Sequence, residues 1–467
     1  MVDPGFFIDR AGELEALERL WSRGEPGLVV VYGRRRVGKT RLILEWLRGR
    51  PHAYFQAGLW SSSQNLEELA RSLEEQLGLG GLSRLGFRSL RDLLQLASRL
   101  LEGRRAAIVL DEFTYWLRVS PSVASDLQWF VDHVLPGTRL LLVISGSLVG
   151  LVERDLLGGG APLYGRARLR LRLGELPAWC LPYFAPRYGE EDLVRLYALL
   201  GGVPQYLRLI DDSTAPVEAY LSLFGPGGAL SDEPLFLLRE EFRDPHPYLA
   251  LLRALAQGAT GVGEAASRAG MPASHASRYL RVLADLGLVE RETPLFSRRG
   301  LYRVGDRLLR SWLYLVEPLW SGLAEGLPGA RREAVRRAEQ LAAEAWERLA
   351  AGHAVSRLSR ELGLEPTLAG RLLHRGLEVD QVVVDEESRR LLAVEAKWSL
   401  LSGGEAARVA RETLARLYAA LPRRYHGYRA EVALYLRGLR GPEPVEAAAV
   451  VTPRDMPWRD GCPQAGG

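Results

Sequence analysis

The sequence predicts an α/β protein of several domains, and three observations support that prediction. A short apolar stretch, Gly27–Tyr32, leads directly into a glycine-rich loop at residues 33–40, and a helical pattern follows. Two later apolar stretches end in polar residues, as strands do at the shared edge of a parallel sheet. Near the C-terminus, strand-like segments that contain acids alternate with long helical segments.

The composition is that of a folded protein without a membrane segment. Of the 467 residues, 47% are hydrophobic and 25% are charged. At about 150 residues per domain, this length predicts roughly three domains. No apolar run approaches the roughly 20 residues that span a bilayer, and the first residues form no long apolar secretory segment. We therefore expect a cytoplasmic protein with no membrane partner.

Charge and cysteine content narrow the partners and the compartment. The net charge is +4 and the isoelectric point is near 9.0, which permits nucleic-acid binding without requiring it. The two cysteines, Cys180 and Cys462, lie far apart in the sequence. This pattern favours a reducing cytosol, so we expect no disulfide.

The loop GRRRVGKT predicts a nucleoside triphosphate site of the Walker A type. Its glycines let backbone N–H groups curl around phosphate, and the helix that follows adds partial positive charge. Lys39 would reach the β- and γ-phosphates, and Thr40 would bind Mg²⁺. The predicted nucleotide-binding residues here are Gly33, Arg34, Arg35, Arg36, Val37, Gly38, Lys39, Thr40 and Arg41.

Lysine usage points to a second site. The chain contains 61 lysines and arginines together, and only Lys39 and Lys397 are lysines. A compact ammonium on a flexible stem does what a planar guanidinium cannot. Because each lysine lies within a recognisable motif, we expect one active site around each.

The strand at residues 106–110 ends in Asp111 and Glu112, which is a Walker B pattern. Asp111 would hold Mg²⁺ through water, and Glu112 would orient or deprotonate the attacking water. The alternative is that the acidic pair caps a helix that begins near Phe113. The order of the two motifs and the buried character of the strand favour the catalytic role.

Two polar features follow a third strand, at residues 140–144. Ser145 or Ser147 could sense the γ-phosphate, and either could instead cap the helix that starts near Leu148. Arg166, in the segment PLYGR, could contact the γ-phosphate in cis, act as an arginine finger in trans, or be a surface cation.

These motifs, with FIDRAGEL at residues 7–14 and GGVPQYL at residues 201–207, resemble the archaeal ATPase family, which is AAA+-related. The resemblance covers roughly residues 1–320. It implies ATP as the nucleotide, Mg²⁺ as its metal, and a helical lid after the ATPase core. No NKxD motif for guanine is present in the sequence.

The segment after the predicted lid has the pattern of a winged helix. Two helical stretches and a turn precede residues 274–288, in which Tyr279, Leu280, Leu283 and Leu286 would form the buried face. Ser274, His275, Arg278 and Arg281 would point outward, and residues 289–304 read as a basic-tipped wing. Such a domain binds DNA or only packs against other domains, and the sequence leaves both open.

The C-terminal part has an α-βββ-α-β order with Asp380 on one strand and Glu395 and Lys397 on the next. Period-two alternation places Glu395 and Lys397 on one face. The pattern resembles the PD-(D/E)xK nuclease superfamily, although no proline precedes Asp380. The resemblance implies that Asp380 and Glu395 bind Mg²⁺ or Mn²⁺ and that Lys397 positions or activates water. Glu344 or Glu347 on the preceding helix could add a ligand.

The sequence thus predicts a P-loop parallel-sheet ATPase core at residues 1–175, a helical lid at 176–245, a winged helix at 246–305 and a restriction-endonuclease-like α/β domain at 306–467. The expected function is an ATP-hydrolysing, DNA-interacting enzyme whose nucleotide state gates a nuclease-like domain. The alternative is a regulatory switch with a C-terminal domain that only binds. A motor would require a homo-oligomeric ring, and the sequence does not determine the oligomeric state.

Overall fold

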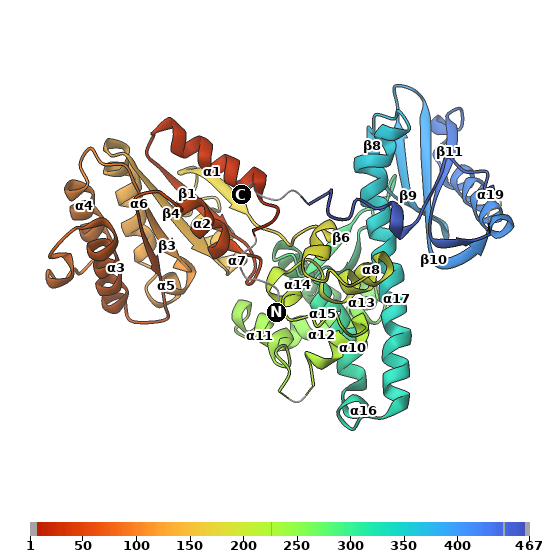
Figure 1. Ribbon diagram of the computed structural model, residues 1–467, viewed down its shortest axis with the longest axis horizontal. Coiled ribbons are helices and arrows are strands. Elements are labelled where there is room, and N and C mark those ends of the chain that lie inside the picture. Colours follow the sequence, from red (N-terminus) through yellow and green to blue (C-terminus); the bar gives the residue numbers. More distant parts are fainter. Residues whose placement is uncertain (1–6, 226, 442–443, 463–467) are drawn as a thin grey trace. The chain divides into compact units, whose positions relative to one another are not determined.

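The computed structural model describes residues 7–225, 227–441 and 444–462, and its contacts divide the chain into two compact units (Figure 1). The first unit runs to Leu176 and includes Val203–Gln205, and the second comprises Pro177–Gly202 and Tyr206–Cys462. The first six residues, part of the segment predicted not to be a secretory signal, lie outside the described residues. The finer division into four domains stays a prediction.

The first unit is a parallel sheet with helices on both faces. Its strand order is β2-β3-β4-β1-β5, and every neighbouring pair is parallel, as predicted for the core. The strands are β1 (Gly27–Tyr32), β2 (His52–Gln56), β3 (Ala106–Asp111), β4 (Leu140–Gly146) and β5 (Ala167–Arg172). The helices are α1 (Ala11–Arg23), α2 (Lys39–Leu47), α3 (Ser62–Leu77), α4 (Leu90–Leu100), α5 (Phe113–Val119), α6 (Val123–His133) and α7 (Val149–Leu151).

Alternation along β1 divides the core of this unit between the two faces of the sheet. Leu28 and Val30 belong to the cluster that includes α3, α4, α5 and α6. Val29 and Val31 belong to the cluster that includes α1 and α2. Because successive side chains of a strand point to opposite faces, one continuous apolar run fills both layers. The carboxyl ends of these buried strands therefore share one edge, which is where the predicted nucleotide residues fall.

The second unit begins with helices. The predicted lid contains α8 (Glu190–Leu200), α9 (Pro204–Leu207), α10 (Pro216–Ser222) and α11 (Glu233–Glu241). The predicted helix-turn-helix is confirmed as α12 (His246–Ala256), α13 (Val262–Arg268) and α14 (Ala273–Asp285), followed by the antiparallel pair β6 (Val289–Glu292) and β7 (Leu301–Val304). The helices α15 (Arg307–Ser311), α16 (Trp320–Ala324), α17 (Pro328–His353) and α18 (Ser359–Glu361) follow.

A mixed sheet ends the second unit. Its order is β12-β11-β10-β9-β8; the pairs β8–β9 and β9–β10 are antiparallel, and the pairs β10–β11 and β11–β12 are parallel. Residues of α17 pack with one set of sheet side chains and residues of α19 with another. The elements are β8 (Leu368–His374), β9 (Leu377–Asp385), β10 (Arg390–Ser402), α19 (Gly403–Ala420), β11 (Arg429–Arg440) and β12 (Ala449–Val451).

The two cysteines form a disulfide, so the expectation of unpaired cysteines is wrong. Cys180 and Cys462 are bonded, with 5.1 Å between their Cα atoms, although they are 282 residues apart in sequence. The segment before Cys462 returns to the start of the second unit, where the Trp458 ring meets the Trp179 ring edge-on at 5.5 Å. The backbone N–H of Arg459 donates to the carbonyl of Trp179 at 3.0 Å. Sequence distance therefore gave no guide to proximity in the fold.

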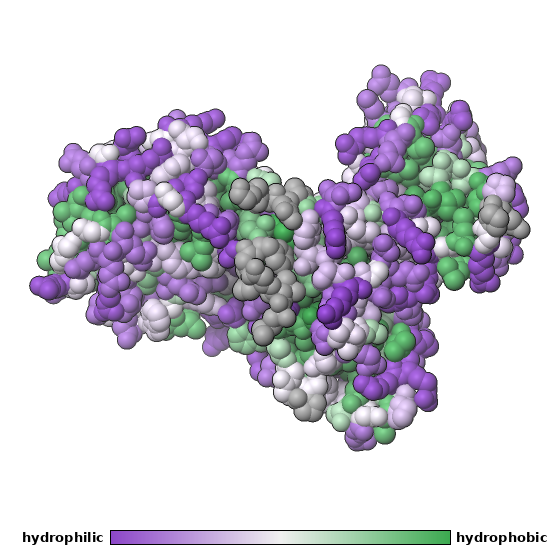
Figure 2. Space-filling model, in the orientation of Figure 1, coloured by the Kyte–Doolittle hydropathy of each residue, from purple (hydrophilic) through white to green (hydrophobic). Residues whose placement is uncertain are grey.

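Hydrophilic side chains cover most of the visible surface of both units (Figure 2). The most exposed large apolar side chains, Leu59 and Leu85, lie outside helices and strands. Among the described residues, no helix is long and apolar enough to cross a membrane.

Candidate functional site

Two glycines at positive φ shape the loop after β1. Gly33 has φ 152°, and a Cβ there would lie 2.3 Å from the carbonyl oxygen of Leu173, so glycine is required. Gly38 has φ 99° and immediately precedes α2. Gly38, the N-cap residue of α2, makes no side-chain capping bond, and a helix N-terminus of this kind favours an anion.

Lys39 is folded back onto this loop. The side chain is buried, and its ammonium donates to the carbonyl oxygens of Gly33 and Arg34, each at 3.0 Å. These bonds keep the ammonium beside the backbone that the sequence predicts to surround phosphate. The Lys39 side chain must bend from the start of α2 back to the loop, which explains why a flexible aliphatic chain is needed at this position.

Asp111 gathers hydroxyl groups from three elements at the sheet edge. It is fully buried at the end of β3, and Thr40 donates to its Oδ2 at 2.7 Å. Ser145, at the end of β4, donates to Oδ1, and Tyr54 of β2 donates to Oδ2. The structure thus brings together the predicted Walker A and Walker B residues.

Tyr54 is a site residue that the sequence reasoning missed. Burial and the neighbouring Asp111 carboxylate raise the pKa of its phenol, so the hydroxyl stays protonated and donates to Asp111. No local signal marks Tyr54, since it approaches Asp111 only because β2 pairs with β3 in the sheet.

Glu112 has a left-handed backbone, with φ 50°, and its carboxylate turns towards Ser147. Its Oε2 accepts from the Ser147 hydroxyl at 2.7 Å and from the Ser147 backbone N–H at 3.3 Å. Glu112 occupies the N-cap position of α5 that the capping alternative gave it, but without a side-chain capping bond. The capping alternative is wrong for both serines, since the N-cap of α7 is Leu148, with no side-chain bond.

The other predicted loop residues are held by neighbours in the first unit. Arg34 lies 3.8 Å from Glu175, and Arg41 lies 3.5 Å from Glu45. Arg35, Arg36 and Val37 belong to the same loop, and Arg36 has φ 66°. Arg10, which is buried, donates to the carbonyl oxygens of Val37 and Gly174 and so links the loop to the segment after β5.

Arg166 is not brought to this edge of the sheet. It precedes β5, whose first residue pairs in parallel with Leu28 of β1, whereas the loop follows Tyr32 at the other end of that strand. Six residues of strand span about 17 Å at 3.3–3.4 Å per residue. The guanidinium is paired with Asp132 at 2.7 Å, which raises its pKa and lowers that of Asp132. This position is therefore inconsistent with a contact between Arg166 and the γ-phosphate of a nucleotide in the same chain. A role as an arginine finger for another copy of the chain stays a prediction.

The second candidate site lies on β9 and β10. Glu395 is buried, and its Oε1 is 2.7 Å from the Lys397 ammonium and 2.8 Å from the guanidinium of Arg416 on α19. Asp380 accepts the backbone N–H of Ala396 at 2.8 Å. The structure therefore brings Asp380, Glu395 and Lys397 together, and Arg416 is an addition that the sequence reasoning missed because it comes from a later helix.

Two properties of this second site suit a hard cation. Glu395 Oε2 is buried and has no hydrogen-bond partner in the described chain. Burial, and next the charge of Glu395, raise the pKa of Asp380, so a cation between the two carboxylates would relieve their repulsion. Among the described residues, however, no group of three or more His, Cys, Asp or Glu side chains is arranged to hold a metal. The residues present fit an ion that keeps several waters.

The two acids of α17 that were proposed as extra ligands behave differently. Glu344 pairs with Arg310 at 2.6 Å and is engaged by α15. Glu347 lies 3.3 Å from Arg371. Burial, followed by the repulsive charge of Asp380, raises the pKa of Glu347 to about 7.

The exposed face of α14 has the polar side chains expected of a recognition helix. Ser274, His275, Arg278 and Arg281 are exposed, while Leu280, Leu283 and Leu286 are buried. Tyr279, which was predicted to lie on the buried face, is only half-buried; its ring centroid lies 4.9 Å from that of Tyr248. At the wing tip, Arg298 and Arg299 are exposed.

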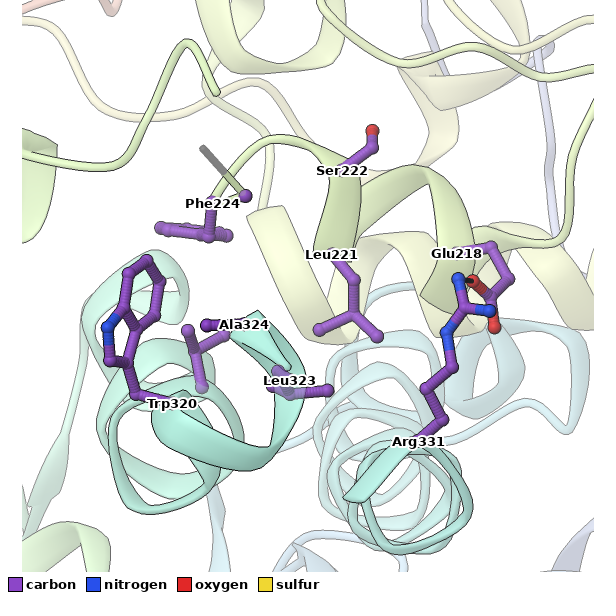
Figure 3. A pocket seen from close by; sticks show the side chains of 10 residues that line it. Glu218, Leu221, Ser222, Phe224, Trp320, Leu323, Ala324 and Arg331 are labelled. Atoms are coloured by element: carbon purple, nitrogen blue, oxygen red, sulfur yellow. Dashed lines mark hydrogen bonds and ion pairs between the residues drawn. The ribbon is translucent and has the colours of Figure 1, made fainter. Parts of the chain in front are cut away.

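A small apolar pocket in the second unit lies among α10, α16 and α17 and has a volume of about 160 Å³ (Figure 3). Leu221, Phe224, Trp320 and Leu323 supply most of the apolar lining that the figure labels. Its two charged residues, Glu218 and Arg331, pair with each other at 2.8 Å. The two charges of the lining therefore neutralise each other, and the rest of the lining is mostly apolar.

The parallel sheet, the glycine-rich loop and the Thr40–Asp111 pair define a P-loop ATPase core in the first unit, and α12 to β7 define a helix-turn-helix domain in the second unit. The match to known families is more specific. Residues 7–210 match the model for an ATPase domain predominantly from Archaea, and residues 248–293 match the IclR helix-turn-helix domain. Residues 312–409 match a family described as "Archaea bacterial proteins of unknown function". The ATPase match agrees with the motifs of the first unit, whereas the nuclease resemblance finds no support in these matches.

Three individual proteins are similar to this chain. An uncharacterized protein of Methanocaldococcus jannaschii is 28% identical over 414 residues, which is 87% of this chain and 90% of the relative. An uncharacterized ATP-binding protein of the same organism is 50% identical over 44 residues, 9% of this chain and 75% of that protein. The Walker-type ATPase of Pyrococcus abyssi has a similar fold, with a TM-score of 0.51 and 20% identity over 66% of this chain and 96% of its own.

Proposed function

We propose that this chain is a cytoplasmic protein that binds and hydrolyses ATP and interacts with DNA, and that its nucleotide state gates a metal-dependent, nuclease-like C-terminal domain. The observation that carries the ATPase part is the 2.7 Å hydrogen bond between Thr40 and Asp111, which joins the two motifs of the nucleotide site. The match of residues 7–210 to an archaeal ATPase domain supports it.

The residues around the loop have separate tasks in this proposal. Backbone N–H groups of the loop and the Lys39 ammonium bind the phosphate oxygens and balance their charge. Thr40 and Asp111 would hold Mg²⁺, which neutralises charge on the phosphates when bound. Glu112 orients the attacking water and takes up its proton, and to do so it releases the Ser147 hydroxyl.

DNA binding rests on the helix-turn-helix domain. Arg278 and Arg281 on the exposed face of α14 would meet a groove, and Arg298 and Arg299 at the wing tip would meet phosphates. In the C-terminal domain, Asp380 and Glu395 would hold Mg²⁺ or Mn²⁺, which lowers the pKa of bound water when present. Lys397 positions that water and balances charge on the scissile phosphate.

A second function is favoured by the state of Glu395. Its Oε1 is already held by Lys397 and Arg416, and the described residues contain no group of three potential ligands for a metal. A nucleotide-driven switch with a C-terminal domain that only binds would account for both facts.

DNA cleavage separates the two functions. Purified protein would be incubated with linear, circular and single-stranded DNA, with Mg²⁺ or Mn²⁺, in the presence and absence of ATP. Cleavage that disappears in Lys397→Ala and persists in Arg408→Ala, a control on the exposed face of α19, supports the nuclease. Intact ATP hydrolysis without cleavage of any substrate supports the switch.

A further inference from the structure

The wing is joined to the edge of the C-terminal sheet. The backbone N–H of Leu295, between β6 and β7, donates to the carbonyl of Arg371 on β8 at 2.7 Å, and Leu295 forms a bridge with Leu372. At the wing tip, the Phe296 ring lies 5.2 Å from the Tyr425 ring. The wing is therefore anchored to the C-terminal domain by backbone and ring contacts.

The side chain of Arg371 meets carboxylates from three elements. Its Nε lies 3.6 Å from Glu292 of the wing strand β6, and its Nη2 lies 3.3 Å from Glu347 of α17. Its Nη1 pairs with Glu378 of β9. The Arg371 side chain is only 17% exposed, so these contacts are weakly screened by solvent. The Arg371 guanidinium is thus shared between Glu292 of the wing and the carboxylates of Glu347 and Glu378.

Arg371 lies close to the acidic site of Asp380 and Glu395 in the sheet. It stands where the register between β8 and β9 shifts, between the pairs Gly370–Val382 and Leu372–Val379, and its partner Glu378 precedes Asp380 by two residues on the same face of β9. Burial and the charge of Asp380 raise the pKa of Glu347, and Glu395 Oε2 is buried with no hydrogen-bond partner in the described chain. A guanidinium that pairs with Glu347 competes with a metal for this carboxylate and repels the metal electrostatically. The contact therefore affects any cation that Asp380 and Glu395 bind.

We propose that Arg371 is a positioning residue that weakens divalent-cation binding at Asp380 and Glu395 by pairing with Glu347 and by its own positive charge, and that the wing modulates this effect because Glu292 shares the guanidinium. The inference rests on the metal-binding part of the proposed function. It links the position of the DNA-binding wing to the affinity of the acidic site for metal.

The test is Mn²⁺ binding to the full chain without nucleotide, measured by calorimetry or by the spin-resonance signal of unbound Mn²⁺. Binding that is lost in Asp380→Asn is assigned to this site. Arg371→Gln should bind Mn²⁺ about 10-fold more tightly, the scale on which partners of metal ligands act. Arg371→Gln with Glu347→Gln should lose the gain, and Arg371→Lys, which keeps the charge, should return towards the wild-type affinity.

The wing supplies an independent arm of the test. In Glu292→Gln, Arg371 keeps only Glu347 and Glu378 as carboxylate partners, so Mn²⁺ binding should weaken. The control variant Arg357→Gln breaks an exposed ion pair with Glu361 and should leave Mn²⁺ binding unchanged. Thermal melts of every variant check the fold. Unchanged affinity in Arg371→Gln overturns this inference alone. No Asp380-dependent Mn²⁺ binding in the wild type overturns the metal-binding part of the proposed function as well.

Discussion

Removal of the disulfide should lower the stability of the second unit by several kcal/mol. The bond between Cys180 and Cys462 closes a loop over a sequence separation of 282 residues, which includes the helix-turn-helix domain and the C-terminal sheet. The chain-entropy relation for a cross-link of this span gives about 5–6 kcal/mol at 25 °C, while measured values are roughly 0–5 kcal/mol. We expect Cys462→Ser to reduce the free energy of unfolding by about 3–5 kcal/mol.

Guanidinium denaturation followed by circular dichroism measures this loss. The wild type would be compared with Cys462→Ser in the presence and absence of a reductant. Because the Trp179–Trp458 contact and the Arg459 backbone bond need no sulfur, the variant should keep the native fold in buffer. Reduced wild type and the variant should unfold together, before oxidised wild type. Equal midpoints for oxidised wild type and Cys462→Ser would refute the reasoning.

Three further predictions concern single side chains. Glu112→Gln should slow ATP turnover about 10²–10⁴-fold and leave ATP binding intact. Phosphate release measures the turnover, and a nucleotide-binding assay measures the binding. Turnover at the wild-type rate would contradict the role of Glu112. Tyr54→Phe removes a hydroxyl group that donates to Asp111. It should lower the free energy of unfolding by about 1.5–3 kcal/mol, the scale of a hydrogen bond to a charged group. An unchanged melting temperature would contradict this stabilising role of Tyr54. Bonds from Ser388 and neighbouring backbone lower the pKa of Asp385 to about 2, so its ionised form stabilises the fold above about pH 4 and the effect is lost towards pH 2. The melting temperatures of wild type and Asp385→Asn should accordingly differ at pH 7 and converge in acid, and a difference that is independent of pH would exclude this cause.

Local patterns predicted the parts of the fold that depend on local physics. The apolar run of β1 and the acids after β3 were readable because strand burial and loop chemistry leave their mark on neighbouring residues. The edge strand β5 was missed because its side chains alternate between half-buried and exposed and form no buried apolar run, and β12 was missed because it has only three residues. Short or exposed strands give little sequence signal.

The missed functional contacts all join residues that are distant in sequence. Tyr54 reaches Asp111 through the order of the strands, Arg416 reaches Glu395 from the helix that follows β10, and Cys462 reaches Cys180 across most of the second unit. No spacing rule encodes these pairs. The three alternatives for Arg166 stayed open in the sequence for a related reason, since its motif does not reveal that it precedes the start of β5, away from the glycine-rich loop.

The affinity for duplex DNA in different nucleotide states tests the central claim most directly. Fluorescence anisotropy would give Kd at fixed salt with ATP, with ADP and without nucleotide, for the wild type, Lys39→Ala and Lys397→Ala. The account predicts that Kd changes by about fivefold or more between nucleotide states, the usual scale of coupling between sites. The change should vanish in Lys39→Ala and persist in Lys397→Ala. One Kd in all nucleotide states of the wild type, or a change that survives in Lys39→Ala, would contradict it.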